Sequence, residues 1–430
     1  MNEHHFVATD GVSGTTALSV SISWLHPIGL VGLSVYNFVM RILTLGFYHF
    51  WGKTEVRKRI WSATRIDGEP LAYTGTGREL LSGFLIVFAI ILLPVMLSTY
   101  GVIFLFGHES TAFKTYQLAL YGSFVFLTGI AIYRAQRYRL NRTTWRGIRA
   151  GLEGSSLRYG WAYFWTLLLI PLTLGWIGPW RQTRLQKMVT GNMRYGDTSF
   201  RFSGSSGPLY KSYAVFWVLL VLLAGTLVAL TLNAWVDFYT VIKAEGKPTH
   251  LSSQQALTAV GFVYGALFLF GFVYMVLSAW YRAAMMRHFA SYTHIDGLTF
   301  RSTVSAGGLL WISVTNYLLL FFGAILATLI VSVIGAAMFQ ALANWGVDPL
   351  GITTAETPAQ AIGAASGLLT FLFILALGMM LPVTNARYTG YLVRKLEAEG
   401  AIDMAAVSAG QAQSIKRGEG LAQAFDIDAL

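Results

Sequence analysis

The sequence predicts an all-α, polytopic integral membrane protein built from internal repeats. Of its 430 residues, 55% are hydrophobic and only 12% are charged, whereas a soluble domain carries about a quarter charged residues. Several apolar runs reach the roughly 20 residues that a helix needs to cross a bilayer. A third observation is a motif of aromatic, basic and turn-forming residues that follows apolar runs and recurs along the chain.

Three regions follow from this pattern. Residues 1–23 are mostly polar and contain no basic stretch followed by a short apolar core, so we do not expect a cleaved signal peptide. Residues 24–396 form the predicted repeat-built transmembrane domain. Residues 397–430 are rich in Ala, Gly and Gln, which predicts a flexible tail.

The repeated motif is clearest at residues 43–77, LTLGFYHFWGKTEVRKRIWSATRIDGEPLAYTGTG. A second copy at 172–206 has nine identical residues at the same spacing, including the LTLG tetrapeptide. Weaker copies lie near 122–156 and 272–306, and a degenerate copy begins near residue 382. The copies at 43–77 and 272–306 contain the pairs Asp67-Gly68 and Asp296-Gly297, which predict tight turns. Such periodicity indicates one structural unit per copy.

The combination LTLG…FW…(K/R)…T-x-x-D-G…(Y/F)-x-G resembles the YjgN-like bacterial inner-membrane proteins, which are built around a domain of unknown function. The resemblance covers roughly residues 24–396. It implies a multi-pass protein of the bacterial inner membrane. It implies no biochemical activity.

The distribution of positive charge predicts the topology. Eight apolar segments can be drawn, at about 28–47, 80–106, 116–133, 161–180, 213–236, 256–280, 309–342 and 362–383. Six of them form three pairs, and the loops within these pairs hold only three of the 31 Lys and Arg: Lys114, Lys243 and Lys247. Because Lys- and Arg-rich loops stay in the cytoplasm, every motif and both termini should be cytoplasmic.

This orientation requires segments 28–47 and 161–180 to enter and leave the membrane on the same side. The segment 161–180 contains Pro171, Gly175, Gly178 and Pro179, which interrupt helices. We therefore expect six full spans and two re-entrant segments, with eight crossings as the alternative. Broken helices of this kind build the binding sites of many transporters.

The residue inventory does not predict an enzyme. The chain has no cysteine, and it contains no HExxH, P-loop or nucleophile-elbow arrangement. We expect no catalytic residues, no metal site and no cofactor. The net charge of +11 does not indicate nucleic acid, because the basic residues flank apolar segments. It indicates contact with anionic lipid headgroups instead.

Two groups of residues are candidate binding sites. Arg41 and Asn37 lie inside the apolar run 28–47, and a charged side chain at membrane depth is a functional candidate. Alternatively, Arg41 caps broken backbone or extends to the interface. The second group combines aromatic and basic residues just beyond apolar runs, where they would anchor the protein and contact anionic lipid. These residues are Trp51, Arg57, Lys58, Arg59, Trp180, Arg184, Lys187, Trp280 and Arg287.

Two functions are compatible with these patterns. The first is a transporter or channel-like protein for a small anionic or lipid-like solute, with Arg41 in its site. The alternative is a non-catalytic scaffold that binds anionic lipids or partner proteins through its basic cytoplasmic face. The solute, the coupling ion and the oligomeric state have no signature in the sequence.

Overall fold

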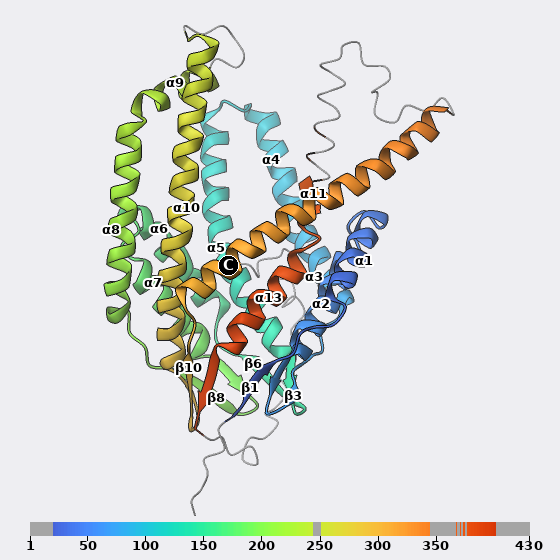
Figure 1. Ribbon diagram of the computed structural model, residues 1–430, viewed down its shortest axis with the longest axis vertical. Helices are drawn as coiled ribbons and strands as arrows, with labels where there is room; N and C mark the ends of the chain where they lie inside the picture. Colours follow the sequence, from blue (N-terminus) through green and yellow to red (C-terminus); the bar gives the residue numbers. More distant parts are fainter. Residues whose placement is uncertain are drawn as a thin grey trace, which may run out of the picture.

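The computed structural model describes residues 20–243, 251–344 and 376–400, together with positions 367, 370, 373 and 374. Long helices extend from one end of the molecule, where short strands gather (Figure 1). The helical class is confirmed, but the all-α prediction was incomplete, because the described residues contain eleven short strands. These strands have two to five residues each, too few to show a clear alternating pattern in the sequence.

The described chain consists of five units with one design: a strand, an outgoing helical segment, a returning helix and a second strand. Unit 1 contains β1 (Ile22–Trp24), α1 (Leu30–Leu43), α2 (His49–Ala63) and β2 (Thr64–Ile66). Unit 2 contains β4 (Ala72–Tyr73), α3 (Gly77–Val87), the π-helical turn η1 (Phe88–Leu92), α4 (Leu93–Phe106), α5 (Thr111–Asn141) and β5 (Thr143–Trp145). Unit 3 contains β6 (Ile148–Leu152), α6 (Ser156–Leu172), α7 (Gly178–Thr190) and β7 (Met193–Tyr195).

Units 4 and 5 complete the series. Unit 4 contains β8 (Thr198–Phe202), α8 (Gly207–Leu230), α9 (Leu232–Lys243), α10 (Ser253–Ser291) and β9 (Thr293–Ile295). Unit 5 contains β10 (Leu298–Ser302), α11 (Ala306–Asn344), α13 (Leu381–Arg394) and β11 (Leu396–Glu399). Ten of the 22 residues in the predicted apolar segment 362–383 lie outside the described residues, as do most residues of the segments 1–23 and 397–430.

One backbone hydrogen bond recurs in all five units and shows that they are equivalent. In each unit, the residue that leads from the first strand to the outgoing helix donates its N–H to the carbonyl oxygen at the end of the returning helix. The donor–acceptor pairs are Leu25–Ala63 (2.8 Å), Thr74–Arg142 (2.8 Å), Glu153–Asn192 (2.9 Å), Ser203–Tyr292 (3.0 Å) and Thr303–Lys395 (2.8 Å). Both ends of every helical hairpin are therefore fixed at the same end of the molecule.

The strands form a ring at that end. Strands β4 to β11 pair in chain order as one antiparallel sheet, and β1, β2 and β3 (Glu69–Pro70) form a second sheet. Only Leu71 separates β3 from β4, and β1 lies next to β11. Tight turns join the units: Asp67 and Gly68 have φ of +50° and +78°, and Arg146 and Gly147 have +48° and +76°. Two positive φ values match the type I′ hairpin turn.

The ring encloses a small apolar cavity of about 190 Å³. Its walls come from strands of all five units, through Ile22, Ile66, Trp145, Tyr195, Phe200 and Leu298, among others. Tyr195 packs on Trp145 and donates its hydroxyl to the Trp145 carbonyl at 2.9 Å, and burial raises the pKa of this tyrosine. Most of the wall is aliphatic or aromatic, and Thr143 and Arg194 are its polar members.

The helices divide into long and short ones. Five described helical segments, of 24 to 39 residues, are long and apolar enough to cross a membrane. They are Gly77–Phe106, Thr111–Asn141, Gly207–Leu230, Ser253–Ser291 and Ala306–Ala337. Only 6% to 17% of the residues in their most apolar windows are buried. Their surfaces therefore suit contact with lipid.

Units 1 and 3 are half-length hairpins. Helices α1 and α6 have 14 and 17 residues, and α2 and α7 return after a short turn. The LTLG tetrapeptide forms this turn in both units. Leu45 and Gly46 have φ of +51° and +92°, and Leu174 and Gly175 have +47° and +84°.

The LTLG turn is held by its own backbone and by its threonine. The N–H of Gly46 donates to the carbonyl of Arg41, and that of Gly175 donates to Ile170, each at 2.7 Å. A hydrogen bond to the carbonyl five residues earlier, at the end of a helix, is typical of a Schellman cap. The Thr44 hydroxyl accepts from the N–H of Tyr48 at 2.9 Å, at the start of α2. The repeated LTLG therefore encodes a helix end, a reversal and a new helix start.

Candidate functional site

The candidate site is the tip of unit 1, where α1 turns into α2. Arg41 lies half-buried in the last turn of α1. The apolar side chains that surround the turn are exposed: Leu43 is 72% exposed, Leu45 is 91% exposed and Phe47 is 58% exposed. A cation and a cap of exposed apolar side chains thus share the end of a short hairpin.

Asn37 has a packing role in this hairpin. It is buried between α1 and α2, and its Nδ2 donates to the carbonyl of Gly52 at 3.3 Å. A Cβ on Gly52 would lie 2.9 Å from the Asn37 Cγ, so the two helices approach closely because Gly52 has no side chain. The structure therefore brings Asn37 and Arg41 onto one helix, with Asn37 inside the hairpin and Arg41 near its tip.

The tip of unit 3 lacks the charge and accepts hydrogen bonds from a neighbouring helix. The residue equivalent to Arg41 is Ile170. Helix α8 holds this tip through Trp217 Nε1, which donates to the Leu174 carbonyl at 2.7 Å, and the Tyr213 hydroxyl, which donates to Gly175 at 2.5 Å. The α8 residues correspond to Phe84 and Phe88 in unit 2, and neither phenylalanine carries a hydrogen-bond donor.

Phe88 also begins the π-helical turn η1 in the first long helical segment. Single π-helical turns within α-helices are frequent at functional sites. No pattern in the sequence indicates this π-helical turn. The first helical segment of unit 2 therefore differs from α8 of unit 4 in two ways. It contains the π-helical turn, and it lacks the two hydrogen-bond donors that α8 directs at the tip of unit 3.

The predicted anchor residues of α2 have different environments. Arg57 is only 5% exposed, and its guanidinium lies 5.8 Å from the ring centre of Tyr73 and donates to the Tyr73 hydroxyl at 3.3 Å. It therefore belongs to the packing of α2 on β4. Lys58 is exposed and pairs with Glu55 at 2.8 Å, and Trp51 packs against Gly77.

The remaining predicted anchor residues lie closer to the surface. Arg59 donates to the carbonyl of Ile28 at 3.0 Å. In unit 3, Arg184 stacks over the partly exposed Trp180 at 5.2 Å, and Lys187 is exposed on the same helix. In unit 4, Trp280 is partly exposed, and Arg287 donates to the Val304 carbonyl at 2.6 Å.

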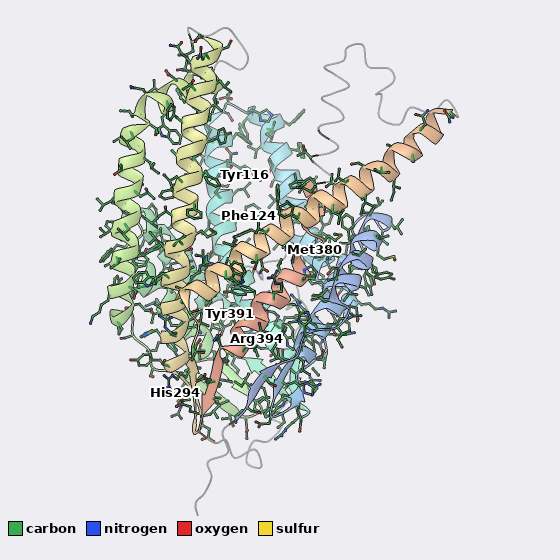
Figure 2. All side chains as sticks on the ribbon, in the orientation of Figure 1. Tyr116, Phe124, His294, Met380, Tyr391 and Arg394 are labelled. Carbon is green, nitrogen blue, oxygen red and sulfur yellow. The ribbon has the colours of Figure 1, made fainter. Side chains whose placement is uncertain are left out.

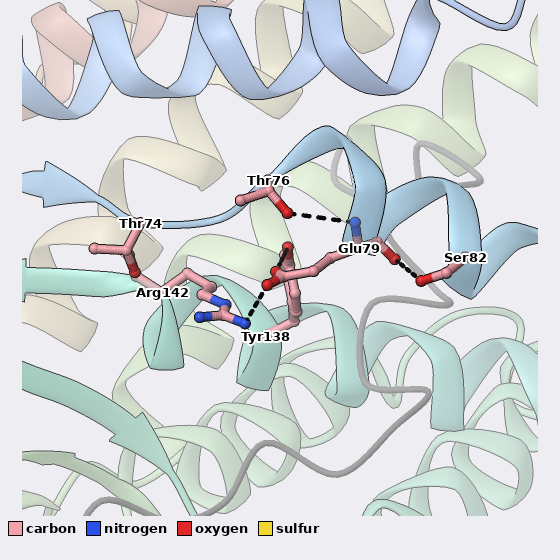
Figure 3. Close-up of polar contacts among 6 residues, drawn as sticks. All are labelled: Thr74, Thr76, Glu79, Ser82, Tyr138 and Arg142. Carbon is pink, nitrogen blue, oxygen red and sulfur yellow. Dashed lines mark hydrogen bonds and ion pairs between the residues drawn. The ribbon is translucent and has the colours of Figure 1, made fainter.

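A polar cluster that sequence analysis missed fastens unit 2 (Figure 3). Glu79, in the first turn of α3, accepts from Arg142 at 2.6 Å and from the Tyr138 hydroxyl at 2.9 Å. Thr76 caps the same helix by accepting from the Glu79 N–H at 3.4 Å. No sequence signal links Glu79 to Arg142, because 63 residues separate them. Across the described residues, no group of three or more His, Cys, Asp or Glu could hold a metal ion.

The fold defines a class: a mostly helical membrane protein whose helical hairpins, long and short, rise from a ring of strands. A model of the family described as "bacterial protein of unknown function (DUF898)" matches residues 29–424, and the chain belongs to this family. The YjgN-like family that the repeated motif indicated is thereby confirmed.

One relative shows what the chain resembles. It is 25% identical over 135 residues to inner membrane protein YjgN of Salmonella typhimurium strain LT2. The match covers 31% of this chain and 31% of that protein, so it extends over about a third of the relative's length. No solved structure matches the chain.

Proposed function

We propose that the protein moves an anionic, lipid-like solute between the two membrane leaflets, along the short hairpin of unit 1, with Arg41 attracting its headgroup. The observation that carries this proposal is the position of Arg41 near the tip of a half-length hairpin, among exposed apolar side chains. Three features support it: the side of the membrane on which the ring lies, the depth of the tip of unit 1 in the bilayer, and the positive charge of Arg41.

The proposed orientation has the ring of strands in the cytoplasm. The hairpin bonds that fix both ends of each unit at the ring support six full spans and two re-entrant hairpins, in units 1 and 3. The described chain ends at residues 20 and 400, both beside the ring, which supports cytoplasmic termini. The concentration of Lys and Arg near the ring supports the same side.

The proposed depth follows from helix length. The 14 residues of α1 rise about 21 Å at 1.5 Å per residue, whereas the hydrocarbon core is roughly 30 Å thick. A hairpin of this length cannot cross the core, so the tip of unit 1 would end within the membrane. A segment too short for the bilayer is accommodated by local thinning, which shortens the path of a lipid headgroup between leaflets.

The charge of Arg41 would add to this effect. An arginine at membrane depth draws water and headgroups toward itself, because an unsolvated guanidinium is costly in hydrocarbon. An anionic headgroup both solvates and neutralises it. The cavity of the ring is lined mostly by apolar side chains, which favours a path along the hairpin surface over a central pore.

Lipid exchange in vesicles tests the proposal. The full chain is reconstituted with fluorescently labelled phosphatidylglycerol in both leaflets, and dithionite bleaches the label in the outer leaflet. We expect the wild type to expose inner-leaflet label and Arg41→Gln to do so at least tenfold more slowly. Arg201→Gln, on the exposed face of β8, is the matched control and should behave as wild type. Equal rates for Arg41→Gln and wild type would refute the route.

A scaffold function is the second candidate, and the exposed cations of α7 favour it. Arg184 and Lys187 lie beside Trp180 on a surface that would meet lipid headgroups or a partner protein. Each such cation contributes about 1 kcal/mol to binding an anionic surface. The scaffold predicts that Arg184→Gln with Lys187→Gln weakens recruitment of an acidic peptide or anionic vesicle, with no exchange of lipid in any variant.

A further inference from the structure

The ring of units is closed without a covalent link, where unit 5 meets unit 1. At this seam β1 lies next to β11, and α1 lies next to α13. The strand ladders of the described residues join β1 to β2 and β11 to β10, but none joins β1 to β11. Side chains close the seam instead: Trp24 packs so tightly on α13 that a Cβ on Gly390 would lie 2.6 Å from its indole.

A groove of about 690 Å³ opens at this seam, between the start of α1, the start of α11 and α13. Tyr391 and Arg394 lie on α13, close to the ring end of the molecule (Figure 2). The Tyr391 hydroxyl accepts from the N–H of Ser305 at 3.2 Å, which ties α13 to the beginning of α11. The groove therefore has a fixed wall, built from two units that are distant in the sequence.

One part of the groove is cationic. Arg387 and Arg394 both line it, together with His26, and Arg59 borders it through its bond to the Ile28 carbonyl. Arg387 donates to the Thr315 hydroxyl at 2.9 Å. The described residues that line the groove include no Asp or Glu, and Arg394 has no ion pair within the described part of the chain. Concentrated positive charge without a protein counter-ion is suited to a phosphate group.

The rest of the groove is apolar and open. Ile28 is 91% exposed, Trp311 is 69% exposed, and Val31 is 55% exposed, and all three line it. They lie at the starts of α1 and α11, the ends of these helices that adjoin the ring. The cationic part of the groove suits the anionic headgroup of a lipid, and the adjacent apolar part suits an acyl chain.

We propose that the seam groove binds one anionic phospholipid, with its phosphate between Arg387 and Arg394 and an acyl chain along Ile28, Val31 and Trp311. The lipid bridges units 1 and 5 and so strengthens the one junction between described units that has neither a covalent connection nor a strand ladder. This site is separate from the tip of unit 1, and its test is independent of lipid movement.

Thermal unfolding of the detergent-purified full chain tests the proposal. We expect phosphatidylglycerol to raise the midpoint of wild type by several degrees, because a ligand of the folded state stabilises it. Phosphatidylcholine and inorganic phosphate should each raise it by less than half as much. Arg387→Gln with Arg394→Gln should abolish the shift caused by phosphatidylglycerol, whereas Arg149→Gln with Arg201→Gln, at exposed positions of β6 and β8, should retain it.

Three results would overturn the site: an undiminished shift in the double groove variant, an equal shift with phosphatidylcholine, or an equal shift with inorganic phosphate alone. The last result would identify a soluble-anion site. Should the double variant fail to fold, Arg394→Gln alone decides the question, because Arg394 supports no described hydrogen bond or ion pair. Native mass spectrometry of that variant should show at least a tenfold lower occupancy by phosphatidylglycerol, and wild-type occupancy would refute the proposal.

Discussion

The carboxylate of Glu79 lies 2.6 Å from the guanidinium of Arg142 and accepts a second hydrogen bond from Tyr138. Glu79 begins the outgoing helix of unit 2, and Arg142 follows the returning helix. The pair therefore fastens the two ends of a long helical hairpin at the point where both meet the ring. The guanidinium of Arg142 also stacks over the Tyr138 ring at 5.9 Å.

Glu79→Gln should lower the thermal stability of the protein without changing its helix content. The substitution leaves Arg142, which is mostly buried, without its carboxylate partner. A buried hydrogen-bonding group that loses its partner lowers the free energy of unfolding by about 1–3 kcal/mol. Unfolding followed by circular dichroism in detergent measures the change. Glu55→Gln is the control, because it removes the exposed pair with Lys58, worth about 1 kcal/mol at most. An equal effect of the two substitutions would contradict this account.

Sequence analysis predicted the helical membrane class and the repeats because both depend on local patterns. It interpreted Thr64–Gly68 and Thr293–Gly297 as turns, but it could not show that the strand at each turn pairs with the first strand of its own unit, as β2 does with β1 and β9 does with β8. The strands pair because each of the five hairpins returns to the same end of the molecule. There, residues distant in the sequence form hydrogen bonds, such as Thr303 and Lys395, which are 92 residues apart.

The predicted site residues show the same limit. Arg41 was selected for its charge within an apolar run, which is a local property. The buried state of Arg57 was not predicted, because it depends on the contact with Tyr73 after an intervening hairpin. The groove residues Arg387 and Arg394 were not selected, because their importance arises only where unit 5 meets the beginning of the chain.

Gly46→Ala should destabilise the tip of unit 1. Gly46 has φ of +92°, and a Cβ at this position would meet no atom within 4 Å, so the cost is one of backbone conformation, about 1 kcal/mol or more. Thermal unfolding measures the loss. Gly32→Ala, within α1 and equally free of neighbours, should be neutral or should stabilise by up to about 1 kcal/mol. A larger loss at Gly32 than at Gly46 would mean that the LTLG turn has another conformation.

Single cysteines can establish the orientation, because the chain contains none. Thr111 and Ser252 lie at the starts of α5 and α10, at the ends of these helices far from the ring, whereas Thr198 begins β8 within the ring. We expect a membrane-impermeant maleimide to label the cysteines at 111 and 252 in intact cells and to leave 198 unlabelled. Position 357 should label as well, although it lies outside the described residues. Labelling at 198 with none at 252 would instead indicate eight crossings, with the segment 161–180 crossing the membrane.

Arg41→Ile introduces the residue that unit 3 carries at the equivalent position, Ile170. A guanidinium at membrane depth costs about 2.5–3.5 kcal/mol on insertion scales, so this variant should be at least as stable as wild type. Its rate of phosphatidylglycerol exchange should nevertheless fall at least tenfold, whereas Arg41→Lys, which keeps the charge, should retain most of it. Gained stability with lost activity is the expected signature of a residue kept for function. If Arg41→Ile unfolds the protein instead, Arg41 has a structural role, and the exchange route along unit 1 loses its central residue.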